Sequence, residues 1–198
     1  MINLKITRIG GNQKARILLV AIYEELAETA AKIDEEIALP LDIVQGGIHL
    51  NGHLFAQEHE ADYDVIISQA GTANAIKGLI NKPVIAIPLT ARDYLTAFKK
   101  AKTLGKKMVL LAHQGEEKQE FEAMYQAITH DTALSFSYTC REDFDGMLGQ
   151  VMTFGQDYAL IGFGGCVEKY ALSIGRPYVL VRSTEKNVRK ALLEARNI

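Results

Sequence analysis

The hydrophobic residues of this chain gather in short runs separated by longer amphipathic segments. The runs cover 15–22, 41–44, 65–67, 84–87, 108–112, 134–138, 159–162 and 178–181. Apolar runs without strict alternation are typical of strands buried on both faces of a parallel sheet. The segments between them carry apolar residues at helical spacing, as at Leu26, Ala30 and Ile33. We therefore expect strands that alternate with helices, and parallel sheets with helices on both faces.

One part of this pattern occurs twice. Residues 62–90, DYDVIISQAGTANAIKGLINKPVIAIPLT, match residues 157–184, DYALIGFGGCVEKYALSIGRPYVLVRST. Each copy predicts a strand, a glycine turn, a helix, an X-Pro step and a second strand, which together make a β-α-β unit. The match extends upstream to 14–21 and 106–113 and downstream into the following helices. A repeat of this length indicates a duplicated domain and not a solenoid.

The duplication predicts the fold class: two tandem three-layer α/β/α lobes with parallel sheets, flavodoxin-like or chelatase-like, with a ligand cleft between the lobes. The helix predicted at 90–104 begins with Thr90 as N-cap and Asp93 in a capping-box position, and it connects the lobes. We expect the last helix to pack back against the first lobe. The first lobe is then 1–89 plus 184–198, and the second is 105–183.

Composition and charge reduce the number of possible functions. The chain of 198 residues is 48% hydrophobic and 23% charged, as in ordinary globular proteins, and its net charge is −2. This charge argues against direct contact with nucleic acid. Cys140 and Cys166 have no metal or redox spacing, which fits a reducing cytosol. Without a signal peptide or a long apolar run, we expect a cytoplasmic protein that does not contact the membrane.

The helix-like stretch 49–61 contains three of the five histidines and is a candidate metal site. His49 and His53 have the i, i+4 spacing of metal ligands, but no third ligand accompanies them. We interpret them as surface histidines and expect neither a metal nor a cofactor.

The glycine turns carry the clearest candidate chemistry. In Ser-Gln-Ala-Gly-Thr (68–72) and Gly-Phe-Gly-Gly-Cys (162–166), a strand passes directly into a helix, so unpaired amides at the helix start can bind an anion. Neither turn is a GxGxxG or Walker sequence, so nucleotide binding is not predicted. Glycines required only by tight turns are the alternative, but two equivalent turns favour binding. We predict a ligand site that consists of Tyr23, Ser68, Gly71, Thr72, Thr90, Asp93, Gly164, Gly165, Cys166 and Ser183.

Two competing functions stay open at this point. An isomerase or lyase acting on a small carboxylate would need an acid-base pair, for which Asp93, His113 and Glu168 are candidates. Asp93 has the alternative role of a helix cap, and His113 that of a strand end. The helix N-terminus could lower the pKa of Cys166, but without a paired histidine a small buried residue is the preferred interpretation. A purely protein-binding module would not need duplicated glycine turns.

Several of these stretches resemble a known family. Residues 23–26 (YEEL), 63–73 (YDVIISQAGTA), 83–88 (PVIAIP), Asp93, 105–107 (GKK) and Gly164-Gly165 are similar to the amino-terminal sensor domain of the propionate catabolism activator family, regulators of sigma-54-dependent transcription. The resemblance covers about 15–195. It implies a two-lobed receptor for 2-methylcitrate or a related small acid, without catalytic residues. In the family this domain precedes an AAA+ ATPase and a helix-turn-helix DNA-binding domain.

The chain departs from the family pattern at two positions. Ala70 stands where the family commonly has glycine, and Cys166 replaces a hydroxyl residue in the second turn. The sequence stops at Ile198, before any Walker motif, so we expect either a sensor fragment or a standalone receptor. The expected partners are a small organic acid, a second copy of the chain in a homodimer with 49–61 as a candidate interface, and the AAA+ and DNA-binding domains in a longer protein.

Overall fold

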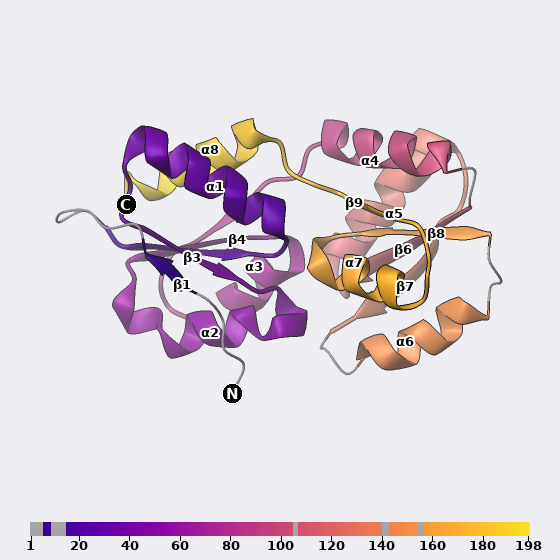
Figure 1. Cartoon of the computed structure of the whole chain (residues 1–198), viewed down its shortest axis with the longest axis horizontal. Coiled ribbons are helices and arrows are strands. Elements are labelled where there is room, and N and C mark those ends of the chain that lie inside the picture. Colours follow the sequence, from indigo (N-terminus) through magenta and orange to yellow (C-terminus); the bar gives the residue numbers. More distant parts are fainter. Residues whose placement is uncertain (1–5, 9–14, 105–106, 140–142, 154–156) are drawn as a thin grey trace. The chain divides into compact units, whose positions relative to one another are not determined.

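The computed structural model describes residues 6–8, 15–104, 107–139, 143–153 and 157–198. The chain divides into two compact units: unit 1 is Met1–Pro88 with Ser183–Ile198, and unit 2 is Leu89–Arg182 (Figure 1). Gly105, Lys106 and Cys140, which were named above, lie outside the described residues.

Unit 1 contains a five-stranded sheet in the order β1-β3-β2-β4-β5. Its strands are β1 (Ile6–Arg8), β2 (Ile17–Ala21), β3 (Leu41–Gln45), β4 (Val65–Gln69) and β5 (Val84–Ile87). The strands β2 to β5 are parallel, as the buried apolar runs predict, and Ile17 pairs with both Leu41 and Val65. The short strand β1 adds an antiparallel edge to β3.

Helices cover both faces of this sheet. The α-helices are α1 (Glu24–Ile37), α2 (Gly52–Glu58), α3 (Ala70–Lys77) and α8 (Glu185–Ala195). In Figure 1, α1 and α8 lie on one face and α2 and α3 on the other. The stretch predicted as one helix at 49–61 is instead three short pieces, with 3-10 turns η1 (Ile48–Leu50) and η2 (Glu60–Asp62) on either side of α2. α8 packs against α1, β4 and β5 and so belongs to unit 1.

Unit 2 contains a four-stranded parallel sheet in the order β7-β6-β8-β9. Its elements are α4 (Ala91–Thr103), β6 (Lys107–His113), α5 (Glu116–Thr129), β7 (Leu134–Tyr138), α6 (Asp143–Met152), β8 (Tyr158–Gly162), α7 (Gly164–Ser173) and β9 (Tyr178–Leu180). The helix α4, predicted as a connector, packs inside this unit. The ring of Tyr94 lies 6.2 Å from that of Phe163, and Phe98 stacks on Phe121 at 5.7 Å.

The two units repeat one architecture. β3-β2-β4-β5 and β7-β6-β8-β9 have the same order, and α1 and α5 both have 14 residues. Even left-handed residues recur: Ala38 (φ 49°) and His130 (φ 61°) end α1 and α5, and Ala70 (φ 51°) and Gly164 (φ 74°) begin α3 and α7. The predicted fold class, two three-layer α/β/α lobes with parallel sheets, is confirmed.

None of the described helices is long and apolar enough to span a membrane. Within the same ranges, no group of three histidine, cysteine or acidic residues is placed to hold a metal ion.

Candidate ligand-binding site

The strand order of unit 1 creates a topological switch point. From β2 the chain first crosses to β3 on one side and then to β4 on the other. In open α/β sheets, ligands bind outside the carboxyl ends of the strands at such a point, because the connections diverge and leave a crevice. The residues at that edge are Tyr23 after β2, Gly46 and Gly47 after β3, and Ala70 after β4. In unit 2 the equivalent switch point lies at the carboxyl ends of β6 and β8.

The turn after β4 is tighter than the sequence predicts. We expected a turn at 68–72 and a helix from Ala73, but β4 continues to Gln69 and α3 begins at Ala70. The same error occurs in unit 2, where α7 begins at Gly164 and not at Val167. The physical reason is the left-handed residue at Ala70 or Gly164, which turns the strand into a helix within one residue. The unpaired amides of the first helical turn therefore lie immediately beyond the strand.

The left-handed conformation of Ala70 leads to a first prediction. An alanine with φ near 51° is strained by roughly 1–2 kcal/mol, which glycine avoids. Glycine loses about 0.4–1 kcal/mol more backbone entropy on folding. Ala70→Gly should therefore raise the free energy of unfolding by about 0.5–1 kcal/mol, measured by thermal unfolding. Ala75→Gly, in the right-handed interior of the same helix, is the control and should lower it by about 1 kcal/mol. A destabilised Ala70→Gly variant would contradict the strained turn.

The predicted side chains of this turn have different environments. Ser68 is fully buried, and its Oγ donates a hydrogen bond to the carbonyl oxygen of Val20 at 2.9 Å, so the hydroxyl links β4 to β2. Thr72 lies beside Gly47, which is absent from the predicted site. A Cβ atom on Gly47 would lie 3.7 Å from Thr72 Oγ1 and 3.2 Å from His49 Nδ1. The Gly46-Gly47 pair at the end of a parallel strand was the available signal.

A hydrogen-bond network brings Tyr23 and Ser183 together. The Ser183 amide donates to the Tyr23 hydroxyl at 3.2 Å, and Ser183 Oγ donates to the carbonyl oxygen of Pro88 at 3.0 Å. Gln69 Nε2 donates to Ser183 Oγ at 3.1 Å. Tyr23 and Ser183 were predicted as site residues, whereas Gln69 was missed. The chain leaves unit 1 after Pro88 and returns to it at Ser183. The network holds both of these segments against unit 1.

Gln69 also has an unused acceptor. Its side chain is 0% exposed, and its Oε1 has no hydrogen-bond partner among the described residues. A buried polar atom without a partner costs about 1–3 kcal/mol. A hydroxyl or N–H donor at this edge of the sheet would remove that cost.

In unit 2, Thr90 and Asp93 form the predicted capping box, which is confirmed. The Thr90 amide and its Oγ1 both donate to Asp93 Oδ2, each at 2.7 Å. The buried Asp93 carboxylate therefore stabilises the start of α4. Gly164 and Gly165 are the first residues of α7. The backbone amides at the start of a helix have no hydrogen-bond partner within the helix.

Cys166 is a buried thiol. It is 4% exposed, its Sγ donates to the carbonyl oxygen of Phe163 at 3.4 Å, and it lies 3.7 Å from the Tyr138 hydroxyl. Burial raises the pKa of Cys166 to about 12, because the charged thiolate would lose its hydration. The expectation that the helix start could lower this pKa is wrong. The preferred interpretation as a small buried residue is confirmed.

The acid-base candidates of the enzyme alternative have structural contacts of their own. Asp93 caps α4. The His113 ring packs edge-on against Tyr138 at 5.8 Å. Glu168 accepts a hydrogen bond from the Tyr178 hydroxyl.

The fold and its switch points define an α/β protein that consists of two units of one architecture. Residues 35–198 match the propionate catabolism activator family, and the chain belongs to this family. The resemblance noted from the sequence is thereby confirmed. The membership assigns the chain to the regulatory domains of transcriptional regulators and is consistent with a sensing domain. No curated protein matches the chain.

Solved structures show the same fold. An NtrC family transcriptional regulator from Clostridium acetobutylicum superposes with a TM-score of 0.75 at 22% identity, over 94% of this chain and 97% of that one. The transcription regulator CcpA of Lactococcus lactis gives a TM-score of 0.51 at 10% identity, over 92% of this chain and 90% of that one. At these identities the likeness concerns the fold alone.

Proposed function

We propose that this chain is the effector-sensing domain of a sigma-54-dependent transcriptional activator and binds a small organic anion, 2-methylcitrate or a related acid. The observation that carries the proposal is the family match over residues 35–198. In a longer protein the domain would control an AAA+ ATPase and a DNA-binding domain. The ligand would act by its difference in affinity between two conformations of the domain, which is how a receptor without chemistry transmits a signal.

The chemistry at the carboxyl edge of unit 1 suits a hydroxy acid. The unpaired amides of Gly71 and Thr72 at the start of α3 can donate to a carboxylate, and the positive end of the helix dipole favours its charge. Gln69 Oε1 needs a donor, which the hydroxyl of such an acid supplies. The equivalent amides at Gly164 and Gly165 in unit 2 would bind a carboxylate in the same way.

The binding site is tested best at Gly47, because its backbone (φ −83°) accepts any side chain. In Gly47→Val the new atoms would occupy the space between His49 and Thr72. Each charge-assisted hydrogen bond is worth about 1.5–3 kcal/mol, so losing one should weaken the binding of 2-methylcitrate about 10- to 100-fold in calorimetry. Gly78→Ala is the control, since its Cβ meets only atoms at 3.6 Å or more.

Three results would count against this proposal. Unchanged affinity of a folded Gly47→Val variant would place the site elsewhere. Failure of the wild-type chain to bind 2-methylcitrate, citrate or similar acids would overturn the ligand class. Conversion of a bound acid to product would favour the isomerase or lyase alternative.

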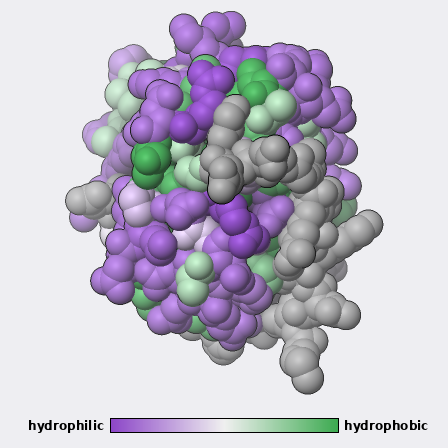
Figure 2. Space-filling model, turned by 90° about the vertical axis from the view of Figure 1, so that its left-hand side faces the viewer, coloured by the Kyte–Doolittle hydropathy of each residue, from purple (hydrophilic) through white to green (hydrophobic). Residues whose placement is uncertain are grey.

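The homodimer is also a proposal. The candidate interface 49–61 includes α2, which buries Ala56 in the core and exposes Leu54. On the face of the molecule drawn in Figure 2, hydrophilic residues cover most of the visible surface, and hydrophobic residues lie singly or in small groups. Analytical ultracentrifugation of the wild-type chain, with and without 2-methylcitrate, measures whether the chain dimerises.

A further inference from the structure

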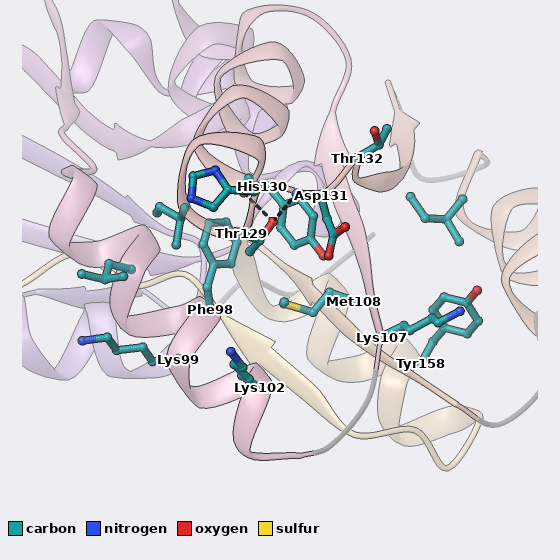
Figure 3. A pocket seen from close by; sticks show the side chains of 14 residues that line it. Phe98, Lys99, Lys102, Lys107, Met108, Thr129, His130, Asp131, Thr132 and Tyr158 are labelled. Atoms are coloured by element: carbon teal, nitrogen blue, oxygen red, sulfur yellow. Dashed lines mark hydrogen bonds between the residues drawn. The ribbon is translucent and has the colours of Figure 1, made fainter.

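A pocket of about 820 Å³ lies wholly within unit 2, away from the glycine turn (Figure 3). Lys107 and Tyr158, which begin β6 and β8, contribute to its lining. The turn at Gly164 follows the other end of β8, and a five-residue strand spans roughly 13 Å. The pocket is therefore separate from the amides of Gly164 and Gly165 that we propose for the effector in this unit.

The pocket combines an apolar interior with cations. Phe98, Met108 and Tyr125 are among its apolar and aromatic lining residues. Lys99, Lys102 and Lys107 also line it, and Asp131 is the sole acidic residue of the lining. In Figure 3, Lys102 and Lys107 lie on two sides of Met108. Across the ranges that the structure describes, none of the three lysines forms an ion pair. Their charges are thus available to a ligand.

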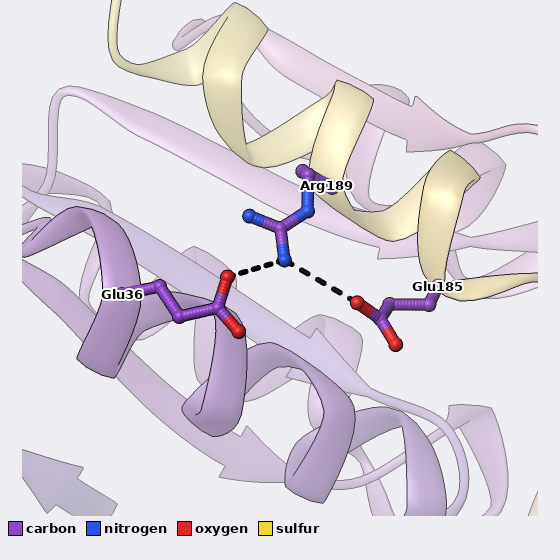
Figure 4. Close-up of polar contacts among 3 residues, drawn as sticks. All are labelled: Glu36, Glu185 and Arg189. Atoms are coloured by element: carbon purple, nitrogen blue, oxygen red, sulfur yellow. Dashed lines mark hydrogen bonds and ion pairs between the residues drawn. The ribbon is translucent and has the colours of Figure 1, made fainter.

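The equivalent place in unit 1 holds an ion pair. By the offsets of the duplication, Leu95 and Ile128 in unit 2 correspond to Arg189 and Glu36 in unit 1. Arg189 Nη2 lies 2.6 Å from Glu36 Oε2 and 3.3 Å from Glu185 Oε1, so the guanidinium bridges α8 and α1 (Figure 4). In unit 2, Leu95 and Ile128 both line the pocket.

The residues near the amino ends of the strands also differ between the units, because those of unit 1 form polar contacts with one another. In unit 1 the Tyr63 hydroxyl donates to Asp42 at 2.9 Å, and the Arg16 guanidinium lies 5.1 Å from the centre of the Tyr63 ring. The residues equivalent to Arg16 and Tyr63 are Met108 and Tyr158, which line the pocket. The residues of unit 1 that correspond to the pocket lining thus form polar contacts with one another, whereas in unit 2 the equivalent residues line the pocket.

We propose that this pocket is a second ligand site, which binds an organic anion with an apolar body, such as a medium-chain carboxylate. The apolar interior takes the hydrocarbon part, and the lysine ammonium groups attract the carboxylate. The volume is within the range of small-molecule sites. This site does not depend on the identity of the effector proposed above.

The test uses the full chain, with 8-anilinonaphthalene-1-sulfonate as a fluorescent anionic probe and octanoate as competitor. Octanoate should displace the probe from the wild-type chain at about tenfold lower concentration than octan-1-ol, which lacks the charge. Lys102→Glu combined with Lys107→Glu should weaken octanoate binding about tenfold or more. Lys100→Glu is the matched control, because Lys100 is exposed on the same helix but does not line the pocket, and it should leave the affinity within about twofold.

A second variant transfers the ion pair of unit 1 into unit 2. Leu95→Arg combined with Ile128→Glu should block the probe and octanoate while all the lysines remain. Its thermal unfolding is compared with that of the wild type before binding is measured. The affinity for 2-methylcitrate should not change, which separates this site from the effector site. Equal displacement by octan-1-ol, octanoate binding unaffected by both double variants, or competition between octanoate and 2-methylcitrate would each overturn the proposal.

Discussion

Gly162→Ala should lower the free energy of unfolding of unit 2 by about 3 kcal/mol or more. A Cβ atom at Gly162 would lie 2.2 Å from the carbonyl oxygen of Leu111 and 3.0 Å from Val167 Cγ2. The Leu111 oxygen belongs to the backbone of β6, so β8 and β6 would have to separate at the centre of the sheet. Overpacking of a well-packed core costs about 1–3 kcal/mol and more where the neighbour cannot move. Because 1 kcal/mol shifts the midpoint of a domain of this size by about 4–8 °C, we expect the midpoint of thermal unfolding of unit 2 to fall by about 12 °C or more.

The control for this variant is Gly149→Ala in α6 of the same unit. A Cβ atom there meets nothing within 4 Å, and alanine is about 1 kcal/mol better than glycine in a helix. Circular dichroism measures both transitions, and hydrogen exchange of β6 and β8 peptides assigns the loss to unit 2. A Gly162→Ala variant as stable as the wild type would show that the two strands are not held at the distance that the structure gives.

The sheets were predictable because their signal is local and occurs twice. The bounds of β5 and β7 agree with the predicted ranges, and the other parallel strands of the two sheets agree to within two residues at each end. Buried strands give apolar runs that can be recognised without tertiary information. The duplication also helped to place the ends of the strands, because each copy could be compared with the other.

The starts of α3 and α7 were not predictable from the same signals. They depend on a left-handed residue, and Ala70 gives no indication of this conformation because alanine normally avoids it. The splitting of 49–61 has a different cause. A Cβ atom on Gly52 would lie 1.9 Å from the carbonyl oxygen of Gly46, so close packing of two backbones decides where α2 begins.

The candidate site was predicted in part. Tyr23 and Ser183 were named from strand ends, and they do meet, 160 residues apart in the sequence. Gln69 was missed because its role depends on a hydrogen bond to Ser183. The two residues are 114 positions apart, and no local sequence pattern predicts a contact over this separation. Ser68 was named for its hydroxyl, but side chains of a strand alternate between faces, and the Oγ of Ser68 points to the neighbouring strand.

Deletion of residues 184–198 should destabilise unit 1 far more than unit 2. The helix α8 buries Val188, Ala191, Leu192 and Ala195, and it packs against α1, β4 and β5. Fully burying one leucine or valine contributes about 1.5–3 kcal/mol. The deletion would also expose the apolar surface of unit 1 that α8 covers. The loss is therefore comparable to the roughly 5–15 kcal/mol that stabilises a whole domain.

Hydrogen exchange with mass spectrometry measures this loss in each unit separately. After the deletion, peptides from β2 and β4 should lose most of their protection, whereas peptides from β6 and β8 should keep it. Leu192→Ala is a milder version and should cost unit 1 about 2–5 kcal/mol, because Leu192 is 1% exposed. Glu194→Ala, exposed on the same helix, is the control. Equal loss of protection in both units would show that they unfold as one, and the domain boundaries proposed from the duplication would then have no thermodynamic meaning.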